Sequence, residues 1–81
     1  MLKLLYFFNL VDLLGCAREE LAFPDGITDV AGLLAWLGKR DEKYRTALAD
    51  GNKLQVTINK QFVDTTTGIK DGDEIAFFPK G

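Results

Sequence analysis

Residues 70–79 read Lys-Asp-Gly-Asp-Glu-Ile-Ala-Phe-Phe-Pro, and this stretch decides the fold of the 81-residue chain. The Asp71-Gly72-Asp73 segment favours a tight turn, because glycine tolerates a positive φ and aspartate side chains hydrogen-bond to nearby backbone groups. Residues 74–78 then predict a strand, which Pro79 ends because proline has no N–H to donate to a neighbouring strand. This part of the chain is therefore predicted to be a turn followed by a strand.

The N-terminal residues 2–8 predict a second long strand. The side chains that share one of its faces are Leu2, Leu4, Tyr6 and Phe8, and those on the other face are Lys3, Leu5 and Phe7. Both faces are largely apolar, so we expect a central strand, or one with a side that faces a partner. The segment lacks the basic region and the small-residue cleavage site of a signal peptide, and we expect it to belong to the folded domain.

The chain between these two strands predicts further helices and strands. They are a short helix over 9–15 with Asn9 as its N-cap and Gly15 at its end, a strand over 17–23, and an amphipathic helix that Thr28 caps and Gly38 closes. A shorter helix follows from Asp41 to Asp50-Gly51, then strands at 54–58 and 62–63, with Ile69 filling the space beneath the loop of residues 65–68. Capping residues, apolar periodicity and turn residues carry these predictions.

This order of elements predicts an α+β roll in one domain spanning residues 1–81. A right-handed crossover would bring the last long strand parallel to the first. The fold class that fits is the ubiquitin-like β-grasp, with a mixed sheet of about five strands, one main helix and short extra helices.

The composition excludes most side-chain chemistry. The chain has no histidine and one cysteine, which removes His-based catalysis, internal disulfides and multi-thiolate metal sites. Cys16 follows a predicted helix end, so we expect it to be structural or incidental, and a single thiol suggests a reducing compartment. No metal site is predicted, because the acidic cluster at residues 71–74 lacks the ligand spacing of a calcium loop.

The charge pattern argues against nucleic acid and membrane partners. Ten basic and twelve acidic residues give a net charge of −2, and the lysines are scattered singly. No apolar stretch approaches the roughly 20 residues that cross a bilayer. The mixed-charge run at residues 39–43 is expected to be a solvated helix junction. We expect a cytoplasmic protein.

Phe7 and Phe78 are the candidate partner-binding residues. Each points away from the apolar face of its own strand, so the two rings lie on the same side if the strands are neighbours. Two alternatives stay open: helices cover both rings, or the rings form an exposed apolar patch of the kind that marks protein interfaces.

The last residues, Pro79, Lys80 and Gly81, are the third candidate. A final glycine presents a carboxylate with no Cβ beside it, which could enter a narrow active site on another protein. Pro79 would stop the strand and begin an extended tail. A final glycine alone is a weak signal.

Four stretches together resemble a known family. They are Leu-Lys-Leu-Leu-Tyr-Phe-Phe at 2–8, Thr28-Asp29-Val30, Val56-Thr57-Ile58-Asn59, and the run at 70–79. They resemble the small, sulfur-carrying subunits of molybdopterin synthase, which are ubiquitin-like proteins, and the resemblance covers essentially the whole chain.

The resemblance implies a sulfur carrier and its partners. A ubiquitin-activating-like enzyme would adenylate Gly81 with ATP, and a sulfur donor protein would supply the sulfur of a thiocarboxylate. The tail of Pro79, Lys80 and Gly81 would enter the large subunit and give sulfur to cyclic pyranopterin monophosphate in molybdenum cofactor biosynthesis. Phe7 and Phe78 would be the docking surface in a heterotetramer with the large subunit. The catalytic pocket would belong to that subunit, and the carrier would bind no cofactor.

The ending departs from the family pattern, which is Gly-Gly after several tail residues. At about 3.3–3.6 Å per residue, Pro79 to Gly81 reaches ~10 Å, against ~20 Å for a six-residue tail. We therefore expect either a truncated or variant chain with the family fold and docking face, or a carrier with an adapted partner. Other open alternatives are a carrier for thiazole or tRNA thiolation, a protein modifier, and a binding module without tail chemistry.

Overall fold

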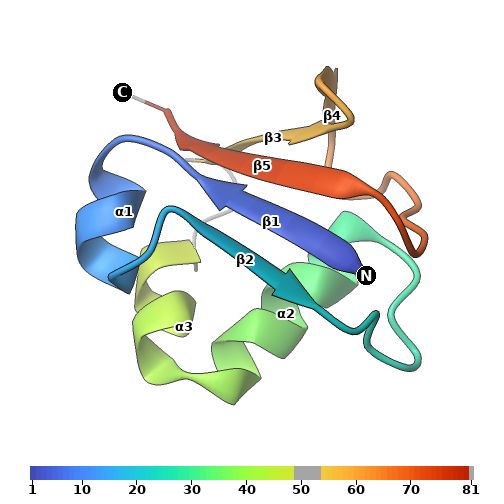
Figure 1. Ribbon diagram of the computed structural model, residues 1–81, viewed down its shortest axis with the longest axis horizontal. Helices are drawn as coiled ribbons and strands as arrows, with labels where there is room; N and C mark the ends of the chain where they lie inside the picture. Colours follow the sequence, from blue (N-terminus) through green and yellow to red (C-terminus); the bar gives the residue numbers. More distant parts are fainter. Residues whose placement is uncertain (49–53, 81) are drawn as a thin grey trace.

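The computed structural model describes residues 1–48 and 54–80. The elements follow the predicted order: β1 (Leu2–Tyr6), α1 (Asn9–Leu14), β2 (Arg18–Leu21), α2 (Val30–Arg40), α3 (Glu42–Leu48), β3 (Leu54–Ile58), β4 (Gln61–Val63) and β5 (Glu74–Pro79). The predicted helix end at Asp50-Gly51 lies outside the described residues. Figure 1 shows the helices gathered on one side of the strands.

The five strands form one mixed sheet in the order β2-β1-β5-β3-β4. The two central strands are parallel, with Leu4 opposite Ile75 and Tyr6 opposite Phe77. The other neighbouring strands pair antiparallel. The predicted parallel pairing of the last long strand with the first is thus confirmed.

The core lies between the helix-facing side of the sheet and the helices α1, α2 and α3. Its fully buried members include Leu2, Leu4, Tyr6, Val30, Leu33, Leu37, Ile75 and Phe77. The Tyr6 and Phe77 rings stack with their centroids 5.8 Å apart. Ile69 is buried, as predicted for the residue beneath the loop. For residues 2–6 and 74–78 the strand alternation read from the sequence therefore places the core correctly.

The N-terminus of α2 corrects a predicted cap. Asp29, not Thr28, is the N-cap, and its Oδ1 accepts a hydrogen bond from the Gly32 N–H at 2.7 Å. Asp29 also forms an isolated antiparallel bridge with Gly68. This bridge holds the backbone of residue 29 extended, which is the conformation that an N-cap needs.

Gly38 does not close α2, which continues to Arg40. A Cβ on Gly38 would lie 3.3 Å from both the Cα and the Cβ of Arg45. The glycine therefore lets α3 approach α2 closely, which is a different use of the missing side chain. The prediction that this glycine is a helix end was wrong.

The start of α1 also differs from the prediction. Phe8 is the N-cap, with no side-chain cap hydrogen bond, and Asn9 is the first helical residue. Gly15 ends the helix with a φ of 78°, as predicted. Phe8 itself has a φ of 57°, so β1 stops at Tyr6 and does not continue to residue 8.

Candidate docking surface and tail

Phe7 and Phe78 stack on the sheet face that the helices leave open. Their ring centroids are 4.4 Å apart and their planes differ by 11°. Alternation along the parallel central strands directs Tyr6 and Phe77 into the core, and the residue that follows each of them points outward. The Phe7 N–H donates to the Phe77 carbonyl at 3.2 Å, which fixes the end of β1 against β5. The prediction that the two rings share one side is confirmed.

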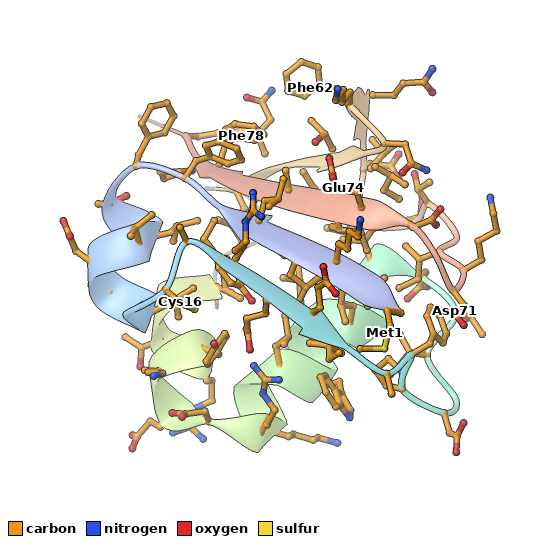
Figure 2. All side chains as sticks on the ribbon, viewed as in Figure 1. Met1, Cys16, Phe62, Asp71, Glu74 and Phe78 are labelled. Atoms are coloured by element: carbon orange, nitrogen blue, oxygen red, sulfur yellow. The ribbon has the colours of Figure 1, made fainter. Side chains whose placement is uncertain are left out.

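The pair remains open to solvent. Phe7 is 36% exposed, and Phe78 is half-buried. Figure 2 shows Phe78 on the outer side of β5, with Phe62 of β4 beyond it. Of the two alternatives left by the sequence, the structure favours the exposed apolar patch.

Phe8 was placed wrongly by the strand pattern. Alternation assigns it to the inner face with Tyr6, but it is 72% exposed and its ring centroid lies 6.5 Å from Phe7 and 6.4 Å from Phe78. The positive φ turns the backbone so that the ring joins the outer pair. Three phenylalanines, Phe7, Phe8 and Phe78, therefore form one cluster, which we call the aromatic cluster.

The tail begins one residue later than predicted. Pro79 is the last residue of β5 and lies opposite Leu54 of β3, so it still belongs to the sheet. Lys80 follows and is exposed, and Gly81 lies outside the described residues. The chain thus leaves the sheet directly beside Phe78. The aromatic cluster and the start of the tail are contiguous.

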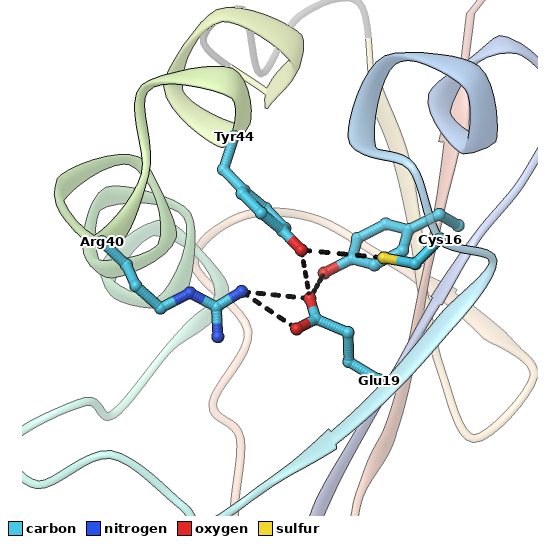
Figure 3. Close-up of polar contacts among 5 residues, drawn as sticks. Cys16, Glu19, Arg40 and Tyr44 are labelled. Carbon is cyan, nitrogen blue, oxygen red and sulfur yellow. Dashed lines mark hydrogen bonds and ion pairs between the residues drawn. The ribbon is translucent and has the colours of Figure 1, made fainter.

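A second cluster, made of polar side chains around Glu19 and called the Glu19 cluster, connects the edge strand β2 to the helices (Figure 3). Glu19 Oε1 accepts hydrogen bonds from the Tyr6 hydroxyl at 2.8 Å and from the Tyr44 hydroxyl at 2.7 Å. Arg40 Nη2 lies 3.1 Å from both carboxylate oxygens. The Cys16 Sγ lies 3.7 Å from the Tyr44 hydroxyl. These side chains come from β1, β2, α2, α3 and the segment before β2.

The electrostatics of the Glu19 cluster keep the carboxylate charged and the phenols neutral. Burial opposes the charge on Glu19, but hydrogen bonds from Tyr44, Tyr6 and Arg40 outweigh it and lower the pKa of Glu19. Burial and the hydrogen bond to Glu19 raise the pKa of Tyr6 and of Tyr44 above the ordinary value. The arrangement is that of a satisfied structural carboxylate and not of a catalytic acid.

The same cluster corrects the prediction for residues 39–43. Arg40 is not simply solvated: its guanidinium lies 4.7 Å from the centre of the Tyr44 ring and 5.3 Å from that of Trp36. The apolar periodicity and charge pattern of the sequence do not predict this cluster. A usable signal was that the chain has two tyrosines, and a buried phenol must find a hydrogen-bond partner.

The acidic turn at residues 71–74 has a structural role, as predicted. Asp73 is buried, and its carboxylate accepts from the Lys70 N–H at 2.9 Å and from the Asn59 side chain at 3.0 Å. Within residues 1–48 and 54–80, no three His, Cys, Asp or Glu side chains are grouped so that they could hold a metal ion. Nor does that part of the chain contain a helix long and apolar enough to cross a membrane.

The fold and the aromatic cluster beside the tail define the class of protein to which this domain belongs. A mixed sheet with parallel central strands, one main helix and an exposed aromatic patch where the last strand ends is the architecture of a ubiquitin-like β-grasp domain. Crystal structures agree: small archaeal modifier protein 1 of Haloferax volcanii superposes with a TM-score of 0.79, covering 99% of this chain and 97% of that one. At 19% identity, that likeness concerns the fold.

Sequence comparison then gives the family. The chain matches the ThiS family over residues 4–80, and it belongs to that family. It is 35% identical over 81 residues to the molybdopterin synthase sulfur carrier subunit of Escherichia coli, covering 98% of this chain and 94% of that protein. The Haemophilus influenzae protein of the same name is 33% identical over 79 residues, with the same coverage of both chains.

Proposed function

We propose that this protein is the sulfur carrier subunit of a molybdopterin synthase. The observation that carries the proposal is the exposed Phe7–Phe78 stack, which lies where β5 ends and the chain continues toward Gly81. The names of two relatives that align over nearly the whole chain support the same function. A carrier needs a docking face and an adjoining tail, and this domain has both elements side by side.

The reactive group in this proposal is the main-chain carboxyl of Gly81. A carboxylate is a poor electrophile because it is negatively charged and carries no good leaving group. Adenylation by a partner enzyme with ATP forms an acyl-phosphate bond and releases pyrophosphate. Sulfide-level sulfur from a donor protein then displaces AMP, so that a carbon–sulfur bond forms as the carbon–oxygen bond to AMP breaks. The thiocarboxylate sulfur next bonds to a carbon of cyclic pyranopterin monophosphate. Water then cleaves the acyl–sulfur bond, which leaves the sulfur on the pterin and restores the carboxylate of Gly81.

The protein's own residues supply recognition in this scheme. The described part of the chain has no histidine, and its Glu19 carboxylate is engaged by two phenols and a guanidinium. The transfer chemistry therefore belongs to the large subunit, where a closed pocket excludes water and provides the electrostatics. Phe7 and Phe78 dock on that subunit, and burial of each ring contributes about 1.5–3 kcal/mol.

The test is the intact mass of the protein after incubation with the adenylating enzyme of the same genome, ATP and a sulfur donor. We expect the mass gain of one oxygen-to-sulfur exchange, located on the last residue by fragmentation. A matched chain that ends at Lys80 controls for labelling elsewhere and should gain nothing. An unchanged mass of the full chain would overturn the proposal. A sulfurated chain that cannot convert cyclic pyranopterin monophosphate with the large subunit would point to a different sulfur-carrier pathway.

A further inference from the structure

Phe8 occupies a backbone conformation that side chains other than glycine rarely adopt. Its φ is 57° and its ψ is −134°. This combination lies close to the region that is essentially restricted to glycine, because a Cβ collides with the neighbouring backbone there. Such strain persists only where the surrounding structure fixes the residue.

Hydrogen bonds on both sides of Phe8 fix it. The Phe7 N–H donates to the Phe77 carbonyl at 3.2 Å, which holds the preceding residue against β5. The Val11 N–H donates to the Phe8 carbonyl, also at 3.2 Å, which holds the following turn of α1. The backbone path between β1 and α1 is thus set by its neighbours, and glycine would be the residue best suited to it.

The contacts of the Phe8 ring within the domain are too few to offset this backbone strain. It is 72% exposed, and both of its aromatic neighbours lie more than 6 Å away, centroid to centroid, in tilted orientations. By contrast, Phe7 and Phe78 stack on each other at 4.4 Å. Phenylalanine at this position therefore contributes a largely exposed ring to the aromatic cluster.

We propose that Phe8 is the anchor of the docking surface, inserting its ring into an apolar pocket of the protein that receives the tail. The inference rests on the proposed function and adds a residue that determines affinity for the large subunit. The position of Phe8 beside the tail identifies the partner that covers it. The Phe8 and Phe78 ring centroids lie 6.4 Å apart, and Lys80 follows Phe78 by two residues. A protein that binds the tail must cover this part of the surface.

The exposed area argues against a second copy of the chain as the occupant. From their exposed fractions, Phe7 and Phe8 together offer roughly 200 Å² of side-chain surface. A stable dimer buries about 800 Å² on each partner. The aromatic cluster alone is therefore too small to hold a homodimer, but it suits an interface that also includes a tail.

The experiment measures, by isothermal titration calorimetry, the affinity of the full chain for the molybdopterin synthase large subunit of the same genome. The variants are Phe8→Ala, which removes the ring and keeps the Cβ, and Phe8→Gly, which also relieves the strain. Lys60→Gly is the matched control, because Lys60 is another residue with positive φ, at 73°, located in the turn between β3 and β4. Thermal unfolding of each variant is followed in parallel.

We expect Phe8→Ala and Phe8→Gly each to weaken binding about 10- to 30-fold, as removal of an aromatic anchor does. Lys60→Gly should bind like the wild type, and Phe8→Gly should melt no lower than the wild type. Wild-type affinity in both Phe8 variants would overturn the inference and leave the proposed function standing. A loss in Phe8→Gly alone, or a marked drop in its melting temperature, would assign Phe8 a backbone role and also overturn it. Failure of the wild type to bind would overturn both proposals.

Discussion

The Tyr44 hydroxyl donates a hydrogen bond to Glu19 Oε1 at 2.7 Å, which joins α3 to the edge strand β2. The Tyr6 hydroxyl reaches the same oxygen from β1 at 2.8 Å. One carboxylate of β2 thus connects β1 with α3, which lie far apart in the sequence. The Glu19 side chain is 23% exposed, so these hydrogen bonds form in a partly desolvated setting where they matter for stability.

The first prediction concerns the ionisation of the two tyrosines, which are the only ones in the chain. Burial and the bond to Glu19 raise the pKa of both phenols above the ordinary value of 10.0. The folded state therefore keeps protons that the unfolded state loses, and stability falls as pH rises above 10. We expect the near-ultraviolet absorbance of tyrosinate to stay absent around pH 10 and to appear together with loss of the far-ultraviolet circular dichroism signal. Tyrosinate that appears at pH 10 in a folded chain would show that the phenols are free.

The second prediction concerns Glu19→Gln. The amide offers one acceptor oxygen where the carboxylate offers two, and it has no charge to pair with Arg40. We expect a loss of about 1–2 kcal/mol in the free energy of unfolding at pH 7, measured with urea. Glu20→Gln is the matched control, because Glu20 is the next residue of the same strand and is exposed. Its effect should stay within about 0.5 kcal/mol.

Acid should remove the difference between Glu19→Gln and the wild type. The pKa of Glu19 is lowered below the usual 4.5, so its contribution is complete above that pH and is lost as pH falls through the folded-state value. The two unfolding curves should converge below pH 4.5. If the difference in unfolding free energy between the wild type and Glu19→Gln stays constant into strong acid, the charge of the Glu19 carboxylate contributes nothing to stability.

The third prediction compares two adjacent residues at the start of α2. Asp29→Ala removes the acceptor that holds the Gly32 N–H, and we expect it to cost about 1 kcal/mol of unfolding free energy. Thr28→Ala changes an exposed side chain and should cost less than about 0.5 kcal/mol. A larger loss of unfolding free energy in Thr28→Ala than in Asp29→Ala would identify Thr28 as the N-cap, as the sequence predicts. Chemical denaturation of both variants decides between them.

These two residues show why helix ends were harder to predict than strands. Threonine and aspartate are both good N-caps, so local sequence cannot choose between neighbours. The choice is made by the bridge between Asp29 and Gly68, which joins residues far apart in the chain. The alternation of β1 and β5, in contrast, was predictable because one face of each strand is covered by helices.

The candidate site was predictable to the same limited degree. Alternation alone placed Phe7 and Phe78 outward, and the parallel pairing of their strands brought them together. Phe8 could not be found in this way, because a single positive φ reverses the face that periodicity assigns. For the Glu19 cluster the two tyrosines indicated only that the phenols need partners, and the partners could not be identified because they converge only once α2 and α3 are packed against the sheet.

The fourth prediction concerns the outer ring pair. Phe7→Ala removes the ring that stacks on Phe78, and we expect affinity for the large subunit to fall at least about 10-fold. Because Phe7 is 36% exposed, the domain should still fold. Lys39→Ala serves as the comparison, since Lys39 is an exposed residue on α2, on the helical side of the molecule. Equal affinities of the two variants in calorimetry would remove Phe7 from the interface.

The fifth prediction concerns the turn between β3 and β4. Ile58 pairs with Gln61, so Asn59 and Lys60 form a two-residue hairpin loop, and both have positive φ, at 51° and 73°. This turn favours Asn-Gly, because lysine is strained in the second position. Lys60→Gly should relieve that strain and raise the free energy of unfolding, by a net of about 0.5 kcal/mol once the greater freedom of the unfolded glycine is subtracted.

Asn59→Gly provides the contrast in the same turn, because it relieves a similar strain but removes two hydrogen bonds. The Asn59 side chain donates to Asp73 Oδ1 at 3.0 Å and accepts from the Glu74 N–H at 3.1 Å. Asp73 is 4% exposed, so its carboxylate would lose a donor in a buried site. We therefore expect Asn59→Gly to lower the free energy of unfolding by about 1–2 kcal/mol. Opposite signs for the two variants in urea unfolding would establish that Asn59 joins the hairpin to the start of β5, whereas equal stabilisation would assign both residues to backbone strain alone.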